Sequence, residues 1–333
     1  MRVSATLCNH DGKVKKGRVC LDGFVDGHCD TIVKLFHSGE KLRRNKNHLD
    51  LERLFHYNGS VQVFALWLDP VYYPIALRQT LKYLDFYQTQ IAQNLDFISH
   101  VESYEDIVQN QKQGRLSALL SIEGGESLEG EIAVLRLLYQ LGVRMMGLTW
   151  NYRNSLADGV RDRETGGGLT AFGKSVVQEM NRLGMIVDVS HLSDRGFYDV
   201  AHIAEAPFIA SHSNSRVICD MPRNLTDDQL RILAEFGGGV GINYYPVFVS
   251  KKKTAEIEDL IQHISHILDV AGENCIGFGS DFDGIHATPK DLRRVEDMEI
   301  FLDRLHREFG KEVTAKIREK NFHRVFRQVL GNI

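Results

Sequence analysis

The segment FVDGHCDT places a histidine and an aspartate, His28 and Asp30, two residues apart in an otherwise apolar stretch. On an extended strand, residues i and i+2 point to the same face, so these two side chains would share a face while Cys29 points to the other. Imidazole and carboxylate groups at this spacing are able to bind a divalent metal ion. The alternative is a strand end that enters a turn, with Asp30 capping a helix that begins at Thr31.

Other ionisable residues occupy the ends of similar short apolar runs. Glu123 ends SIE, His191 ends VSH, His212 ends ASH, and Asp281 follows GFGS. Each of them alone could cap a helix or shape a turn. Their repeated occurrence at the ends of successive runs is harder to explain in that way, and it predicts that they meet in one site.

The element pattern that must position these residues is an alternation of short apolar runs with longer amphipathic segments. Helix boundaries are marked by an N-cap at Thr170, an N-cap at Thr226 and a glycine past several ends. The runs are rich in β-branched residues, as buried parallel strands are. The eight runs are 24–28, 61–68, 116–124, 143–150, 185–191, 207–212, 239–245 and 275–284.

Eight strand–helix units predict an α/β fold, a (β/α)8 TIM barrel formed as a single domain by residues 23–333. Residues 1–22 precede the first strand and are expected to form a short N-terminal appendage, and the chain from Val295 onward reads as helical to its end. An open doubly wound sheet is the alternative, but no GxGxxG fingerprint follows the first strand.

In such a barrel the chemistry lies at the C-terminal ends of the strands. Three histidines and several carboxylates at this rim fit two zinc ions about 3.5–4 Å apart that share one carboxylate, although manganese or cobalt would suit the same ligands. Asp281 is then left as the proton-transfer group. The predicted ligands are His28 and Asp30 for one ion, His191 and His212 for the other, and Glu123 as the bridge between them.

Three other motifs resemble metal-binding motifs in residue type and spacing alone. The second His-x-Asp, His48 and Asp50, introduces a helical pattern, so Asp50 is interpreted as an N-cap. His263 and His266 lie one turn apart in a helix without a partnering carboxylate motif, and we expect them at the surface or an interface. His286, just past the eighth strand, could support the site from behind.

Bulk properties exclude several functional classes. The 333 residues carry a net charge of −4 without a basic cluster, which argues against nucleic acid as a partner. No stretch approaches the roughly 20 apolar residues of a membrane span, and the N-terminus has no apolar core of a signal peptide. Five scattered cysteines indicate neither a disulfide framework nor a zinc finger. We therefore expect a protein of the cytoplasm.

The ordered segments DGHCDT, SIEGGESL, LGVRMMGLTWN, MIVDVSHLS, PFIASHSNSR, MPRNLTDDQL and IGFGSDFDG resemble the membrane (renal) dipeptidase family of zinc peptidases, in the amidohydrolase superfamily. The resemblance covers about residues 24–330 and implies a barrel enzyme, usually a homodimer. It implies that Arg223 contacts the substrate carboxylate and that Asp281 is the acidic residue of the eighth strand. The five predicted metal ligands match the family's dinuclear zinc ligands, with Glu123 bridging.

One departure from the family pattern concerns substrate binding. Mammalian members carry a substrate-binding histidine after LT, where this chain has Trp150. We expect Trp150 to form an apolar wall, with Asn151, Tyr152 or Asn154 supplying polar contacts, and specificity to differ accordingly. The sequence also lacks the signal peptide and C-terminal anchor signal that the resemblance would otherwise suggest, which indicates a soluble, bacterial-type member.

The function predicted by residues and resemblance together is hydrolysis of dipeptides, with a C-terminal D-residue as one option. The nucleophile would be a hydroxide held between two zinc ions, and Asp281 would move the proton to the leaving amine. An amidohydrolase of another amide or a lactone is the alternative. A non-catalytic metal-binding scaffold is a third reading, supported only by Trp150.

Overall fold

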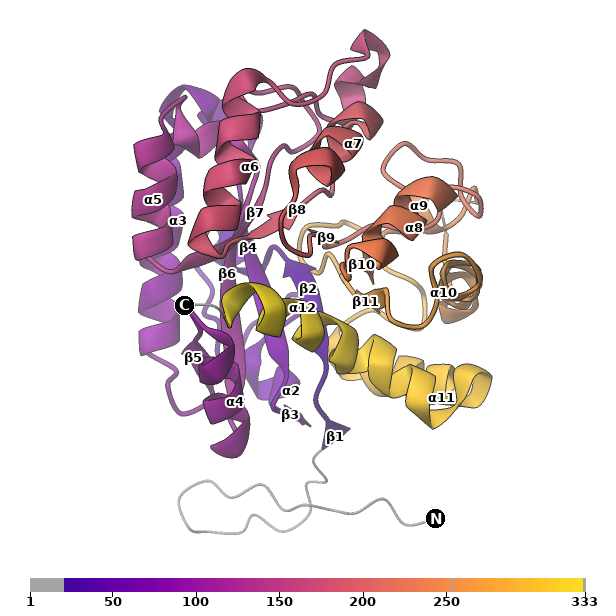
Figure 1. Cartoon of the computed structure of the whole chain (residues 1–333). Helices are drawn as coiled ribbons and strands as arrows, with labels where there is room; N and C mark the ends of the chain where they lie inside the picture. Colours follow the sequence, from indigo (N-terminus) through magenta and orange to yellow (C-terminus); the bar gives the residue numbers. More distant parts are fainter. Residues whose placement is uncertain (1–20, 253, 332–333) are drawn as a thin grey trace.

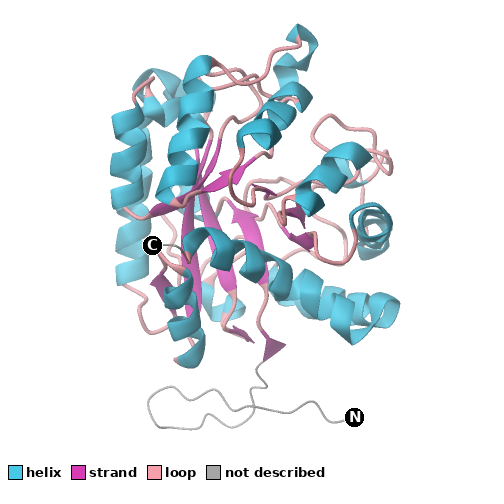
Figure 2. Cartoon of the chain, in the orientation of Figure 1, coloured by secondary structure: helices cyan, strands magenta, loops and turns pink. Residues whose placement is uncertain are grey.

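A closed barrel of eight parallel strands forms the centre of the molecule, surrounded by helices (Figures 1 and 2). The computed structural model describes residues 21–252 and 254–331. All eight predicted strands are present, which confirms the (β/α)8 barrel. They are β2 (Val25–Cys29), β4 (Val61–Trp67), β6 (Leu116–Glu123), β7 (Val143–Gly147), β8 (Ile186–Asp188), β9 (Ile209–Ala210), β10 (Gly239–Ile242) and β11 (Ile276–Phe278).

The strands pair in the order β4-β2-β11-β10-β9-β8-β7-β6, and a pairing between β4 and β6 closes the ring. This last pairing runs from Val61 opposite Ser117 to Trp67 opposite Glu123. Since all strands are parallel, their C-terminal ends lie at one rim. The predicted site residues therefore share that rim although they are up to 253 positions apart in sequence.

The helices cover the outside of the barrel (Figure 2). Thr170 and Thr226 cap their helices as predicted, each accepting a hydrogen bond from a backbone N–H three residues on. The longer helices are α1 (Thr31–Ser38), α3 (Ala76–Ala92), α4 (Tyr104–Lys112), α5 (Ile132–Gln140), α6 (Ala171–Leu183), α7 (Asp194–Ile203), α8 (Asp227–Glu235), α10 (Ile257–Ala271), α11 (Met298–Ala315) and α12 (Asn321–Leu330).

Several shorter elements escaped the sequence patterns. Strand β5 (Ile98–His100) pairs with the start of β6, and β1 (Leu21–Asp22) pairs with β3 (Tyr57–Asn58). Two or three residues are too few to show a period. The remaining short elements are α2 (Leu51–Leu54), which the predicted cap at Asp50 had indicated, α9 (Pro246–Val249), the 3₁₀ helices η1 (Pro70–Ile75), η2 (Gly125–Leu128), η3 (Val160–Thr165) and η4 (Val295–Asp297), and the π-helix η5 (Lys316–Lys320). Of the predicted appendage 1–22, residues 1–20 lie outside the described residues.

The C-terminal region is helical as predicted, with one interruption. Gly310 within α11 has φ 76° and ψ 174°, a conformation that breaks the helix and that glycine adopts without steric cost. The chain resumes through η5 into α12, which lies across the barrel (Figure 1).

Helix α12 packs against one end of the barrel interior. Its Phe322 lies where side chains at Gly27, Gly239 and Gly277 would otherwise stand, since a Cβ at each would meet the ring at 2.7–3.0 Å. Phe322 and Phe326 join apolar residues of β2, β4, β6, β7, β8 and β9 in one buried cluster. The N-terminal end of the barrel is therefore packed, and the polar site lies at the opposite end.

Cys29 lies next to His28 and is fully buried among apolar side chains. Because the thiol packs against the apolar core, replacing Cys29 by alanine is expected to cost about 1 kcal/mol of stability through lost packing. The metal content and the hydrolytic activity expected from the sequence should not change, as measured by elemental analysis and dipeptide hydrolysis. The neighbouring change His28→Ala is the matched comparison, and it should lower metal content and activity together. A Cys29→Ala protein that loses metal would contradict this placement.

Candidate active site

The six predicted groups converge at the C-terminal rim of the barrel. They come from the ends of five strands, β2, β6, β8, β9 and β11. The five predicted ligands are nearly inaccessible, with exposed fractions between 1% and 7%, and Asp281 is half-buried. Burial of so many ionisable groups costs free energy unless they are paired or bind ions. The six are His28, Asp30, Glu123, His191, His212 and Asp281.

Glu123 lies between two groups of side chains and directs one oxygen to each. Its Oε2 is 3.6 Å from Nε2 of His28, which is itself 3.4 Å from Oδ2 of Asp30. Its Oε1 is 2.8 Å from Nε2 of His191 and 3.6 Å from Nε2 of His212. These separations are close to those between neighbouring ligands of one ion whose bonds are about 2.0–2.2 Å long.

The donor set at this rim fits divalent metal ions better than a network of hydrogen bonds. Both ring nitrogens of His28 and Oδ1 of Asp30 are buried without a hydrogen-bond partner in the described part of the chain. Asp30 occupies the N-cap position of α1, yet its side chain makes no capping hydrogen bond. The alternative in which the Asp30 side chain caps this helix is therefore wrong. The carboxylate instead lies within 4.8 Å of possible ligand atoms of His28 and Asp281.

Two of these residues have an uncommon backbone conformation. His191 has φ 69° and Asp281 has φ 60°, in the left-handed region that non-glycine residues seldom adopt. Each lies three residues past the end of its short strand, β8 or β11, in a turn that directs its side chain into the rim. Such strain is typical of functional positions.

The rim groups also shift one another's ionisation. Burial alone would raise the pKa of Glu123, but the three histidines around it outweigh burial and hold that pKa well below its usual range. Burial, together with the charge of Arg223, lowers the pKa of His191 to about 4, so its ring is neutral at pH 7 and able to bind a metal. In the metal-free protein, burial raises the pKa of Asp281 to about 8.

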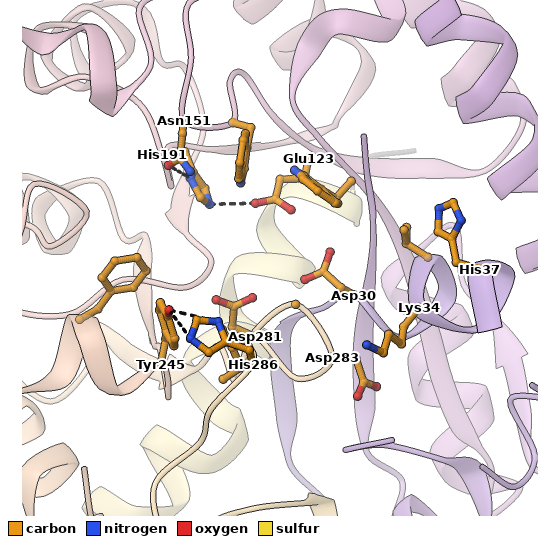
Figure 3. A pocket seen from close by; sticks show the side chains of 16 residues that line it. Asp30, Lys34, His37, Glu123, Asn151, His191, Tyr245, Asp281, Asp283 and His286 are labelled. Carbon is orange, nitrogen blue, oxygen red and sulfur yellow. Dashed lines mark hydrogen bonds and ion pairs between the residues drawn. The ribbon is translucent and has the colours of Figure 1, made fainter. Parts of the chain in front are cut away.

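A cavity of about 430 Å³ opens over the rim, and Asp30, Glu123, His191 and Asp281 point into it (Figure 3). Trp150 and Trp67 stand edge to face on its wall, with ring centroids 5.2 Å apart. The remaining lining residues are Val33, Lys34, His37, Asn151, Tyr245, Phe248, Asp283, Gly284, Ile285 and His286.

The other predicted substrate contacts are placed differently. Arg223 is buried beside the rim rather than on the cavity wall, and its Nη2 donates to the carbonyl oxygen of His212 over 3.1 Å. Its Nε has no hydrogen-bond partner within residues 21–252 and 254–331. Asn151 lines the cavity, but its Oδ1 lies 2.8 Å from Nδ1 of His191 (Figure 3). Tyr152 is exposed outside the lining and accepts a hydrogen bond from Arg161, while Asn154 is bonded to its own loop.

The structure confirms the reading of Asp50 but not the expected positions of His286 and His263. Asp50 caps α2 by accepting from the backbone N–H of Arg53. His286 lies on the cavity wall beside the Tyr245 hydroxyl. His263, expected at the surface or an interface, is fully buried and bonds to the backbone of Ser215 and Val249. The face of α10 that carries His263 packs against the core. The His-x-x-His spacing alone does not show which face of the helix is buried.

Three buried polar residues behind the rim were not predicted. Asp26 accepts from the backbone N–H and the hydroxyl of Ser280 and so fixes the residue before Asp281. Asp188 accepts in the same way from Ser211, the residue before His212. Asn243 donates to Oδ2 of Asp281 over 2.9 Å. For Asp26 and Asp188 the sequence signal was a polar residue inside a strand two or three positions before a proposed ligand, as in Asp26-Gly-His28, whereas Asn243 has no such signal.

A parallel barrel with buried histidines and carboxylates at its C-terminal rim is the arrangement of metal-dependent hydrolases. A model of the membrane dipeptidase family, peptidase family M19, matches residues 22–331. The chain therefore belongs to this family, and it is a metallo-dipeptidase.

Individual relatives agree with this assignment. Dipeptidase aclJ of Aspergillus oryzae is 37% identical over 293 residues, which cover 81% of this chain and 69% of that protein. The crystal structure of the metallopeptidase dipeptidase AC superposes with a TM-score of 0.86 at 26% identity, over 93% of this chain and 99% of that chain. A Rhodobacter sphaeroides metallopeptidase, solved with a phosphinate mimic of the dipeptide L-Ala-D-Ala, has a TM-score of 0.85 at 24% identity, with the same coverage.

Within residues 21–252 and 254–331, no helix has both the length and the apolar character needed to cross a membrane. The cytoplasmic location and the homodimer expected from sequence remain predictions.

Proposed function

We propose that this chain hydrolyses dipeptides with two zinc ions held at the rim of the barrel and bridged by Glu123. His28 and Asp30 would complete one site, and His191 and His212 the other. The observation that carries the proposal is the division of the two Glu123 oxygens between these two groups, at 2.8–3.6 Å from the ring nitrogens. A bound metal pair supplies an acidified water as nucleophile and polarises the scissile carbonyl.

Asp281 is proposed as the group that accepts the proton of the attacking water and returns it to the leaving amine. Its carboxyl lies on the cavity wall next to the ligand atoms of His28 and Asp30. Asn243 holds Oδ2 by a hydrogen bond, so Oδ1 is the oxygen available for proton transfer.

The apolar wall of the cavity would orient the substrate. Trp67 and Trp150 present ring surface beside the metal ligands, and Trp150 lies 6.2 Å from the ring of His191. We propose that this wall contacts a substrate side chain, and that Tyr152, which is not among the lining residues, supports it by packing edge to face on Trp150 with ring centroids 5.5 Å apart.

Arg223 is proposed to bind the terminal carboxylate of the dipeptide. Burial lowers the pKa of Arg223 to about 10, so the guanidinium is still charged at neutral pH, and its Nε has no partner among the described residues. A charge-assisted hydrogen bond contributes about 1.5–3 kcal/mol. Arg223→Met should therefore raise KM for dipeptides about 10–100-fold with a smaller change in kcat.

The check is a comparison of each dipeptide with its C-terminal amide. The wild-type enzyme should prefer the free acid, and Arg223→Met should remove most of that preference. An unchanged preference for the free acid in the variant would assign the carboxylate to another residue.

The proposed function is tested by assaying zinc-loaded protein on L-Ala-L-Ala, L-Ala-D-Ala, an alanine tripeptide, an N-acyl amino acid and a lactone. The D-residue is included because of the ligand bound by the Rhodobacter protein. The expected result is hydrolysis of one or both dipeptides with kcat/KM on the order of 10⁴ M⁻¹s⁻¹ or more, and much slower turnover of the rest. Faster turnover of the N-acyl amino acid or the lactone than of any dipeptide would favour the alternative amidohydrolase function.

A further inference from the structure

The two histidines on the Oε1 side of Glu123 are held from behind by specific polar partners. Nδ1 of His191 lies 2.8 Å from Oδ1 of Asn151, and Nδ1 of His212 lies 2.7 Å from Oγ of Ser211. His28 differs, since neither of its ring nitrogens has a hydrogen-bond partner in the described residues. The hydrogen bonds at the first two histidines determine where each ring carries its proton.

At His212 the direction of the hydrogen bonds follows from Asp188. Oδ1 of Asp188 accepts from the backbone N–H groups of Ser190 and Ser211, each over 2.9 Å. Its Oδ2 lies 2.6 Å from Oγ of Ser211 and accepts that hydroxyl proton. A hydroxyl has only one proton to donate, so Ser211 Oγ must accept at His212, and Nδ1 of His212 is the donor.

At His191 the direction follows from the amide of Asn151. An amide oxygen only accepts, so Nδ1 of His191 donates to it. A neutral imidazole carries one proton, and in both rings that proton is now at Nδ1. Both Nε2 atoms therefore present lone pairs toward the rim.

These lone pairs face one another. The two Nε2 atoms are 2.9 Å apart, and Oε1 of Glu123 lies 2.8 Å from the first and 3.6 Å from the second. Three acceptors without a proton between them repel, and a cation at their centre removes that repulsion.

We propose that Asn151, and Asp188 acting through Ser211, are positioning residues that hold His191 and His212 in the tautomer able to bind metal. This inference rests on the proposed two-metal function and assigns Asn151, expected from sequence to contact substrate, a role behind the ligand. Partners of metal-bound histidines typically contribute 10–100-fold to metal affinity. The contribution should be confined to one of the two ions, because the ring nitrogens of His28 and Oδ1 of Asp30 have no hydrogen-bond partner among the described residues.

The experiment measures zinc affinity by competition with a chromogenic chelator in the wild-type protein and in Asn151→Leu, Asn151→Asp, Ser211→Ala and Asp188→Asn. The leucine variant removes the acceptor with little change in volume, and the aspartate variant keeps an acceptor oxygen. In Asn151→Leu and Ser211→Ala, we expect one of the two zinc equivalents to bind 10–100-fold more weakly and the other to bind with unchanged affinity. In Asn151→Asp, we expect both equivalents to bind with nearly wild-type affinity. Ser211→Ala and Asp188→Asn should not be additive, since they interrupt the same chain of hydrogen bonds.

A second readout does not depend on metal or activity. In metal-free protein labelled with ¹⁵N-histidine, His191 and His212 should both show the Nδ1–H tautomer in the wild type, and His191 should lose this preference in Asn151→Leu. Two equivalents bound with wild-type affinity in both Asn151→Leu and Ser211→Ala would overturn the inference. A wild-type protein that binds fewer than two equivalents would instead count against the proposed function, so the two failures are distinguishable.

Discussion

Asp281→Asn is expected to lower kcat for dipeptides by about 10²–10⁴-fold, the usual contribution of a general acid–base group. Asparagine has nearly the same shape and can still lie beside Asn243, but it cannot accept the proton of the attacking water. KM should change little, because Arg223 and the tryptophan wall are untouched. The measurement is steady-state hydrolysis of the best dipeptide, with metal content determined on the same sample.

The control for this variant is its metal content. Asp281 is half-buried and lies near His28 and Asp30, so a lost charge could in principle act through the metal. The proposed role requires both zinc equivalents to remain while kcat falls. A variant that keeps both ions and retains near-normal kcat would show that another group transfers the proton.

Glu123→Gln is expected to abolish activity and to weaken both metal equivalents by more than about 100-fold. The two oxygens of this carboxylate lie beside the two groups of proposed ligands, so under the proposal its charge would be lost from both sites at once. Removing a residue that only supports a ligand weakens metal affinity by up to about 100-fold, and removing a bridging ligand should weaken it more. By comparison, His191→Ala should remove one equivalent and leave the other at His28 and Asp30.

Glu126→Gln is the matched control for that change. Glu126 is a mostly buried glutamate three residues along the chain, and it accepts a hydrogen bond from Asn154 rather than joining the ligand groups. Its glutamine variant should keep two equivalents and most of the activity. If Glu123→Gln lost only one equivalent, Glu123 would be a ligand of a single ion and the bridge would be wrong.

The architecture could be predicted from sequence because buried parallel strands leave a strong pattern. Each of the eight apolar runs contains a strand in the structure, and capped amphipathic segments lie between them. Strand β5 was missed because three residues carry no period. The break at Gly310 was missed because a single glycine within a helical pattern is usually tolerated.

The rim could also be predicted, because position at a strand end is visible in the sequence. That rule brought His28, Glu123 and Asp281 together from three distant segments, and the structure places their ligand atoms at one rim. The same rule excluded His48 as a ligand, because His48 precedes a helix cap and not a strand end. The rule does not identify residues behind the rim, such as Asp188. The role of Asp188 depends on its contact with Ser211 of the neighbouring strand, and the sequence does not show which strands are neighbours.

The proposed substrate contacts were harder to place from the sequence than the proposed metal ligands. Asn151 and Tyr152 are adjacent in sequence, yet one lies against His191 and the other is exposed outside the cavity lining. Both belong to the irregular segment after β7, where no period fixes the direction of a side chain. Only the path of this loop in three dimensions distinguishes them.

The most direct test of the two-metal account is the metal content of the wild-type protein after gentle purification with zinc in the medium. Elemental analysis should find two equivalents per chain, and chelation to the metal-free state should abolish dipeptide hydrolysis until two equivalents are restored. One equivalent or fewer, with full activity, would contradict the account.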